Sequence, residues 1–463
     1  MPLWLSGLAC GAERTGNRRH KEKAEGPRMP YLRRFFASRQ SAFPGRRMSG
    51  IAATGHCKHY LKSKHKFCAW PVVAEGLCGH HRLVGRVPCP VDGTHTVATA
   101  ELAAHVLVCT AARQAAEAFA ALHIRAGVNA GSNEEGDDAE AHAAEAASLW
   151  RLRCEDERFA DACARVRRVA SLVLAAVAQL PRPTSTPAVL PTCVAEALSR
   201  AAEAAALPHS TSPYDAKHAQ QQAAILAAMH AVRLLPPRED TVYAELGAGR
   251  GYLLHTLAES YGACRLLFVE RRSYRCKAER SLRRRQGVQV ARLRCDVADL
   301  QLDAAVRSLD GQSRRVVAVA KHLCGSGTDV ALRAAARSGA LAGVAVAGCC
   351  HHACTWRAFV NKPMLRAAGL GPREFAVAAR LASWSVDSHG GAPAGCDVAA
   401  ASRWGLSAQE RAEVGAAVKL LFDQARAQWI ADQCGAPASL VYYVDRELTP
   451  ENRLIVMACG QGA

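Results

Sequence analysis

The residues best suited to chemistry are three closely spaced glycines, Gly247, Gly249 and Gly251, which follow an apolar run beginning at Val242. An acid, Glu270, ends the next apolar run. Glycines at a strand-to-helix turn let the backbone approach a ligand, and an acid about 20 residues further on can bind a ribose diol. The pattern therefore predicts a nucleoside-binding site. The alternative is an ordinary strand-to-helix turn.

Two residues beside the glycine loop indicate which nucleoside binds. Tyr252 occupies the position at which a dinucleotide-binding loop has its third glycine, and Glu245 lies just before the loop. A carboxylate at that position would repel a diphosphate but attract the ammonium and sulfonium groups of S-adenosylmethionine. We therefore expect S-adenosylmethionine rather than NAD as the cofactor.

Polar residues also follow the later predicted strands. Asp296 follows the third strand, where methyltransferases usually bind the adenine amino group, while Lys321 and His322 end the fourth strand and His351 follows the fifth. Ligands of open α/β sheets lie beyond the carboxyl ends of the strands. Asp296 is therefore expected to bind the cofactor, and Lys321, His322 and His351 are candidates for catalysis at the methyl acceptor.

The segment from Cys349 to Cys354 contains three cysteines and two histidines. Its side chains can bind a metal, line the substrate pocket or supply a cysteine nucleophile. Because adjacent residues are not expected to converge all together on one ion, pocket lining is favoured over metal binding.

A first set of predicted zinc ligands consists of Cys89, His95, His105 and Cys109. His105 and Cys109 are four residues apart and would share one face of a helix. Two thiolates and two imidazoles make a closed tetrahedral site, which is typical of structural rather than catalytic zinc.

A second set of predicted zinc ligands lies upstream and consists of Cys57, Cys68, Cys78 and His81. Four nearby histidines are alternative ligands for this site: His56, His59, His65 and His80. We expect two structural zinc ions in this part of the chain.

The elements that must position these residues are predicted from apolar runs. Short strands are expected at 242–246, 266–270, 288–294, 316–321, 344–349 and 454–458. Strands that alternate with helices are typical of an α/β fold with a doubly wound parallel sheet, here a Rossmann-like class I methyltransferase domain over residues 214–463. Residues 385–415 are expected to form an inserted loop.

The preceding residues divide by composition. Residues 1–50 are expected to be a basic, disordered extension. Residues 56–83 and 87–110 are expected to be zinc fingers, because so few apolar residues cannot form a core without metal. Residues 111–208 are rich in alanine and predict a helical linker region.

The composition limits the partners and the compartment. A net charge of +18 favours a polyanionic partner, either nucleic acid or an acidic membrane surface. The lack of any run of 18 apolar residues argues against a membrane span. Nineteen cysteines without a secretory signal favour a reducing compartment, and we expect the nucleus or cytoplasm. The arginine-rich segment 31–47 resembles an organelle transit peptide, so mitochondrial targeting is the alternative.

The segment after Glu270 is expected to be a basic helix that follows an RNA backbone, or else an ordinary solvated face. Its basic residues are Arg271, Arg272, Arg275, Lys277, Arg280, Arg283, Arg284 and Arg285.

Several blocks together resemble the eukaryotic tRNA 2'-O-methyltransferases that modify nucleotide 4 of the acceptor stem. The resemblance runs from about Cys57 to Cys459. Besides both cysteine and histidine sets and the glycine loop, the similar blocks are Tyr214 to Gln221, Lys321 to Gly325, Cys349 to His352 and Thr449 to Asn452.

The resemblance implies methyl transfer from S-adenosylmethionine to a ribose 2'-hydroxyl in tRNAs such as those for Gly, Pro and His. It implies zinc in both fingers, and it leads us to expect Lys321 and His322, then His351, to accept or hydrogen-bond the hydroxyl proton. Lys217 is an alternative contact for phosphate. No protein partner follows from the sequence. A rival hypothesis is a zinc-finger nucleic-acid-binding protein whose methyltransferase-like domain is inactive.

Overall fold

The structure is a computed structural model that describes residues 55–109 with short gaps, and residues 123–460 apart from 133–137, 187–188, 208–214, 275–276, 311, 313 and 388–403. The extension predicted for residues 1–50 lies outside the described residues. The chain divides into two compact units, residues 1–112 and residues 113–463.

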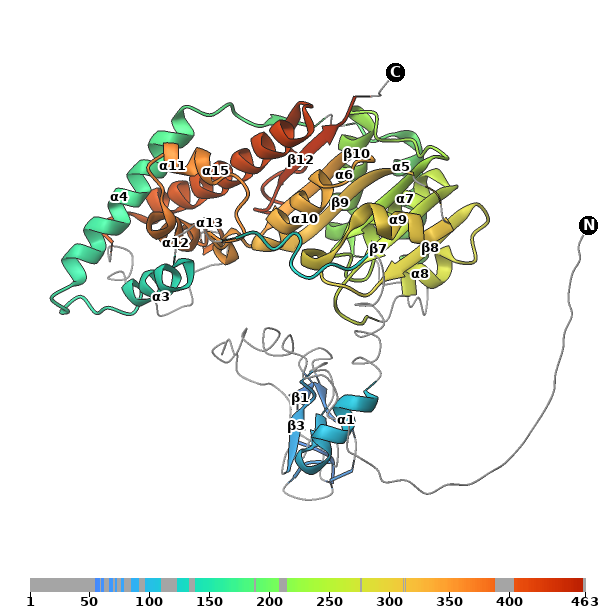
Figure 1. Cartoon of the computed structure of the whole chain (residues 1–463), viewed down its shortest axis with the longest axis horizontal. Coiled ribbons are helices and arrows are strands. Elements are labelled where there is room, and N and C mark those ends of the chain that lie inside the picture. The colour runs from blue at the N-terminus through green and yellow to red at the C-terminus, as the bar shows by residue number, and fades with distance from the viewer. Residues whose placement is uncertain are drawn as a thin grey trace, which may run out of the picture. The chain divides into compact units, whose positions relative to one another are not determined.

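The first unit contains two small antiparallel strand pairs and a short helix (Figure 1). β1 (Tyr60–Leu61) pairs with β2 (Lys66–Phe67), β3 (Arg86–Pro88) pairs with β4 (Thr96–Ala98), and η3 (Thr99–Glu101) leads into α1 (Leu102–Val108). Its two described clusters of buried apolar residues consist mainly of cysteines. Strands this short around so few apolar side chains need a further source of stability, which a bound metal would provide.

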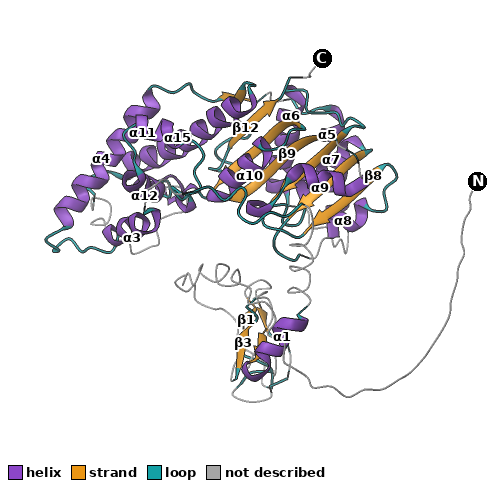
Figure 2. Ribbon diagram, viewed as in Figure 1, coloured by secondary structure: helices purple, strands orange, loops and turns teal. Residues whose placement is uncertain are grey.

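The second unit is built on an eight-stranded sheet with the order β5-β11-β12-β10-β9-β6-β7-β8 (Figure 2). All six residues of the central strand β6 are buried, as expected for a strand that helices cover on both faces. The strands are β5 (Thr184–Ser185), β6 (Thr241–Leu246), β7 (Cys264–Val269), β8 (Val288–Leu293), β9 (Arg315–Cys324), β10 (Leu341–Cys349), β11 (Ala438–Tyr442) and β12 (Arg453–Ala458).

The α/β fold and its mostly parallel sheet are confirmed, but the prediction of a wholly parallel sheet is wrong. β12 runs antiparallel to both of its neighbours, β10 and β11. The physical reason is the short connection of residues 443–452, since antiparallel neighbours can be joined by a short loop, whereas parallel neighbours need a long crossover. No strand was predicted at β11 or at β5, and these two strands pair with each other.

Successive residues of the strands point to opposite faces of the sheet. Tyr243 packs in the core beneath one set of helices, while Val242 and Ala244 pack beneath the other. The first set comprises α5 (Thr192–Ala206), α6 (Ala216–Ala231) and α7 (Tyr252–Tyr261). The second comprises α9 (Leu302–Asp310), α10 (Ser326–Ala336) and α15 (Ala408–Cys434).

A separate helical core lies beside the β12 side of the sheet, around the long helix α15 (Figure 1). Trp356, Phe375 and Phe422 are buried in it. It is formed by α3 (Ala139–Leu149), α4 (Phe159–Ala178), α11 (Lys362–Ala367), α12 (Pro372–Leu381), α13 (Trp384–Asp387) and α15. None of the described helices is long and apolar enough to span a membrane.

The loop predicted over residues 385–415 is only partly a loop. α15 already begins at Ala408, where Ser407 and Glu410 form a reciprocal capping box. The capping pair, Ser followed three residues later by Glu, was a visible sign of the helix start. Residues 388–403 lie outside the described residues.

Candidate functional site: a pocket at the carboxyl ends of β6 and β9

The glycine loop connects β6 to α7 and has positive φ angles at Gly247, Gly249 and Gly251, 72°, 52° and 78°. Such angles suit glycine because they strain other residues. Close packing is a second reason for glycine at two of these positions. A Cβ on Gly247 would collide with the side chain of Leu323, and one on Gly251 would lie 2.7 Å from the ring of Phe268.

Glu270, directly after β7, holds this loop in place. One carboxylate oxygen accepts a hydrogen bond from the backbone N–H of Gly249 at 2.9 Å. The other accepts a hydrogen bond from the backbone N–H of Arg272 at 2.8 Å. The buried carboxylate therefore fixes the loop conformation, and its predicted contact with a ribose stays a prediction.

A pocket of about 540 Å³ opens beside the loop and is lined by α5, α6, α7 and the ends of β6 and β9. Four predicted site residues line it: Glu245, Gly251, Lys321 and His322. The other predicted cofactor residues, Gly247, Gly249, Glu270 and Asp296, are not among its lining residues.

Glu245 and Asp296 have different surroundings. Glu245 is buried, accepts a weak hydrogen bond from the N–H of Leu254 at 3.4 Å, and has its pKa raised to about 8 by burial. Asp296 caps η4 (Val297–Asp299) and lies 3.2 Å from a guanidinium nitrogen of Arg271. A buried carboxylate with a raised pKa favours a cationic ligand, whereas Asp296 already has a partner.

A bulge at the end of β9 aims the next polar residues at the pocket. Ala347 of β10 pairs with Lys321 and Gly348 pairs with Leu323, so His322 is an extra residue, with a φ of 60°. A bulge with a left-handed residue turns its side chain away from the regular ladder, and such bulges are common beside active sites.

Lys321 and His322 meet two residues from α6. The Nζ of Lys321 lies 3.2 Å from Nδ1 of His218, and Nε2 of His322 lies 3.2 Å from the side-chain oxygen of Gln221. The two rings, His218 and His322, pack edge to face with centroids 6.0 Å apart. The pocket therefore has a wall with one amine and two imidazoles.

Burial lowers the pKa values of two residues of this pocket wall, Lys321 and His322. It lowers the pKa of Lys321 to about 8, against the opposing attraction of Glu245 and Asp215. Burial, followed by the repulsion of Lys321, lowers the pKa of His322 to about 4. Lys321 can therefore lose its proton near neutral pH, and His322 is a neutral imidazole there.

The structure does not bring His351 to this pocket. His351 belongs to η5 (His351–Ala353), is 1% exposed, and has its Nε2 2.6 Å from Oδ1 of Asp423 and its Nδ1 3.6 Å from Oε2 of Glu451. Asp423 in turn is paired with Arg426 and Arg453. The geometry places His351 in a buried ionic network rather than beside a substrate.

Comparison with known proteins identifies the family. The family model described as Methyltransferase TRM13 matches residues 220–458, just over half of the chain. The chain belongs to the TRM13 methyltransferase family. The match spans both the glycine loop and the pocket wall of Lys321 and His322.

Three TRM13 relatives show how far the similarity extends. The tRNA:m(4)X modification enzyme TRM13 homolog of Homo sapiens is 27% identical over 88% of this chain and 95% of its own length. The Schizosaccharomyces pombe enzyme is 30% identical over 52% of this chain and 67% of its own. The Oryza sativa enzyme is 32% identical over 48% of this chain and 91% of its own length.

The first unit of this TRM13 chain brings together three residues of each predicted zinc site. One group is Cys57, Cys68 and Cys78, the other Cys89, His105 and Cys109. In each group two sulfur atoms are 3.9 Å apart, close to the separation of about 3.8 Å that follows from Zn–S bonds of 2.3 Å at a tetrahedral angle. Both groups thus fit zinc. The predicted fourth ligands, His81 and His95, lie outside the described residues.

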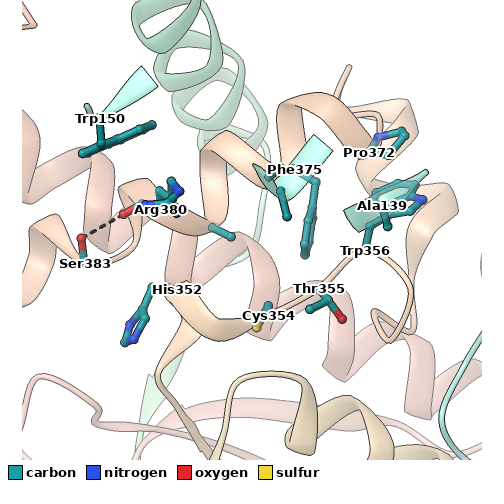
Figure 3. Close-up of a pocket in the computed structure, with 13 residues that line it drawn as sticks. Ala139, Trp150, His352, Cys354, Thr355, Trp356, Pro372, Phe375, Arg380 and Ser383 are labelled. Atoms are coloured by element: carbon teal, nitrogen blue, oxygen red, sulfur yellow. Dashed lines mark hydrogen bonds between the residues drawn. The ribbon is translucent and has the colours of Figure 1, made fainter. Parts of the chain in front are cut away.

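A second cavity, of about 330 Å³, lies in the helical part of the chain, and its lining includes His352 and Cys354 from the segment expected to line a pocket (Figure 3). Trp150, Trp356 and Phe375 supply aromatic walls, and the guanidinium of Arg380 lies 5.6 Å from the Trp150 ring. Thr355 also lines it. This cavity is separate from the pocket of Glu245 and Lys321.

No role was predicted from the sequence for His218 and Gln221, which contact Lys321 and His322. A usable signal existed, since Asp215 caps α6 and His218 and Gln221 are three residues apart on it, which places both on one helix face. Nothing in the sequence showed that this face meets the end of β9.

Among the described residues of the basic segment after Glu270, which leave out 275–276, six are helical and form α8 (Lys277–Leu282). Arg271, Arg272, Arg283 and Arg284 are exposed. Arg285 is paired with Glu259 at 2.6 Å.

Proposed function

We propose that this protein transfers a methyl group from S-adenosylmethionine to the ribose 2'-hydroxyl of nucleotide 4 in the tRNA acceptor stem, in tRNAs such as those for Gly, Pro and His. Membership of the TRM13 methyltransferase family supports methyl transfer. The relatives named as tRNA:m(4)X modification enzymes support tRNA as the substrate. The observation that supports the site most directly is the pocket shared by Glu245, the glycine loop and Lys321.

The donor side of the pocket fits S-adenosylmethionine. This cofactor supplies a methyl group on a positively charged sulfur. Burial raises the pKa of the Glu245 carboxyl to about 8 against the attraction of Arg292 and Lys321, so a cationic ligand would stabilise its charged form. Gly251 and Tyr252 lie at the start of α7, where the backbone can approach the cofactor.

The acceptor side has a general base in Lys321. Deprotonation of a ribose hydroxyl needs a base in its unprotonated form, which for lysine is the neutral amine, and burial lowers the pKa of Lys321 to about 8. His218, 3.2 Å away, is placed to orient the amine, and His322, whose pKa is lowered to about 4, is placed to accept a hydrogen bond without competing as a cation.

The tRNA side is supported by charge. The exposed arginines Arg271, Arg272, Arg283 and Arg284 follow β7, whose end is next to the glycine loop. The net charge of +18 favours a phosphate backbone as partner. We further propose that the fingers, over residues 56–83 and 87–110, each bind structural zinc and contribute to tRNA binding.

The test uses the full chain, labelled S-adenosylmethionine and an unmodified tRNA-Gly. Ribose methylation leaves an alkali-resistant dinucleotide, so label recovered in that dinucleotide supports the proposal, and label released wholly as mononucleotide contradicts it. A matched tRNA with a 2'-deoxyribose only at nucleotide 4 should accept no label. Equal labelling of both tRNAs would place the methyl group elsewhere.

The rival hypothesis is an inactive methyltransferase-like domain behind nucleic-acid-binding fingers. Equilibrium binding of S-adenosylmethionine to the full chain separates the two, because an inactive pocket need not bind it. Absence of binding at millimolar cofactor, with tRNA binding intact, would favour the rival.

A further inference from the structure

Three cysteines meet at the ends of the neighbouring strands β9 and β10, outside both cavities described above. They are Cys324, the last residue of β9, Cys349, the last residue of β10, and Cys350. Their sulfur atoms all lie within 4.8 Å of one another, and those of Cys324 and Cys349 are 3.4 Å apart.

The backbone explains why these thiols converge. Cys324 and Cys349 are direct partners in the parallel register of β9 and β10, so their side chains lie beside each other. Cys350 follows in a left-handed conformation, with φ 51° and ψ 46°. This turn brings the thiol of an adjacent residue back to the same point, which extended backbone would not do. Of the three cysteines and two histidines in this segment, Cys349 and Cys350 belong to the group, so the expectation that its residues do not converge all together on one ion agrees with the structure.

The surroundings hold this arrangement in place. The N–H of Gly325 donates a hydrogen bond to the carbonyl of Cys349 at 2.9 Å, which joins the two strand ends beyond the ladder. On the other side of Cys350, His351 is held by Asp423 at 2.6 Å. A non-glycine residue in the left-handed region costs about 1 kcal/mol or more, so its presence between two fixed points indicates a function.

The sulfur geometry matches metal binding better than a disulfide. The distance of 3.4 Å between Cys324 and Cys349 is far longer than the roughly 2.05 Å of a disulfide bond. It is within a few tenths of an ångström of the separation of about 3.8 Å expected for two thiolates on tetrahedral zinc. Thiolates prefer zinc and other soft cations over magnesium or calcium.

We propose that Cys324, Cys349 and Cys350 bind a third zinc ion, separate from the two zinc sites of the first unit. Each thiol gives up its proton on binding, and one water completes the tetrahedron. Cys349 is buried and Cys324 is exposed, so the open position faces solvent on the Cys324 side. The ion would fix the end of β9, two residues beyond the bulge that aims His322 at the pocket.

The test is the zinc content of the purified full chain, measured by mass spectrometry after removal of loosely bound metal. Cys324→Ser should lower zinc by about one equivalent per chain relative to the unaltered protein, because three protein ligands become two. Cys324 is exposed, so the change buries no new polar group, and circular dichroism checks the fold.

Cys434→Ser is the matched control, since Cys434 is half-buried in the same unit and outside the described cysteine groups. It should keep the full zinc content. Equal zinc in the unaltered protein and in Cys324→Ser would overturn the proposal. So would a Cys324–Cys349 disulfide found by non-reducing peptide mapping in protein purified with reductant. Neither measurement involves tRNA, so failure here is distinct from failure of the proposed methylation.

Discussion

The carboxyl ends of β9 and β10 lie side by side in the sheet, yet their polar residues face different surroundings. At the end of β9, Lys321 and His322 line a solvent-accessible pocket beside the glycine loop. At the end of β10, His351 is 1% exposed and bound within a network of charged side chains. The same position relative to the sheet thus holds pocket-lining side chains in one case and a buried ionic cluster in the other.

The helix α15 explains the difference. It supplies Asp423, which contacts His351, and Arg426, which is fully buried and bound to Asp329 at 2.6 Å. At the end of β9 the helix that meets Lys321 and His322 is α6, which presents His218 and Gln221 and no carboxylate in these two contacts. A polar residue at a strand end therefore indicates a site only when the element packed over it leaves space.

The largest effect should come from Lys321→Met. Loss of a general base typically lowers the rate by about 10²–10⁴-fold, and we expect this loss in kcat of tRNA methylation with S-adenosylmethionine binding retained. Lys217→Met is the matched control, because this exposed lysine of α6 should alter KM for tRNA more than kcat. A normal kcat for Lys321→Met would show that Lys321 is not the general base.

Arg426→Met tests the β10 side of the comparison. Removal of this buried cation takes the ion pair from Asp329 and one of several partners from Asp423, which keeps Arg453 and His351, and should lower the free energy of unfolding by about 3–5 kcal/mol in denaturant titration. Arg200→Met removes an exposed pair with Glu196 and should cost less than about 1 kcal/mol. Similar losses from both substitutions would contradict a structural role for the buried network.

Glu245→Gln should weaken the binding of S-adenosylmethionine and leave the fold intact. A hydrogen bond to a charged group contributes about 1.5–3 kcal/mol, so the Kd for S-adenosylmethionine should rise by about 10–100-fold in calorimetry. Glu259→Gln, which alters a partly exposed acid of the same pocket further along α7, should change Kd much less. Equal affinities for the unaltered protein and Glu245→Gln would show that the buried carboxylate serves the fold alone.

The smallest expected change, counted per pH unit, is in kcat, whose pH dependence Lys321 should determine. The amine must be neutral to act as base and its pKa is lowered to about 8, so kcat should rise about tenfold per pH unit below 8 and level off above it. Glu245 and Asp215 oppose the loss of the proton, and His218 and His322 face the same amine. Saturating S-adenosylmethionine keeps titration of Glu245 from affecting occupancy. A kcat that is constant between pH 6 and 9 would exclude Lys321 as base.

Much of the fold was predictable because apolar runs and glycines act locally. The six predicted strands are present, and the glycine loop lies where its spacing placed it. β11 and the reversed direction of β12 were not predictable, because strand direction depends on which neighbour a short connection reaches. The two-residue strand β5 has too few residues for any periodicity.

The site was predictable only in its parts. Spacing placed Lys321 and His322 at a strand end, but could not show that a bulge turns His322 towards α6. His351 has the same kind of position in the sequence, and its burial depends on Asp423, which is 72 residues away in the chain. The convergence of Cys324 with Cys349 depends on strand register, which a single sequence does not specify.

Leu323 joins three neighbouring parts of the sheet edge. Its side chain fills the space that a Cβ would need at Gly247 and also at Gly327, so the glycine loop and the start of α10 fit around one leucine at the end of β9. A residue larger than glycine at position 247 would meet two obstacles, the φ of 72° and the side chain of Leu323, and a smaller residue at 323 would remove only the second. The glycine loop and the end of β9 are therefore packed as one unit.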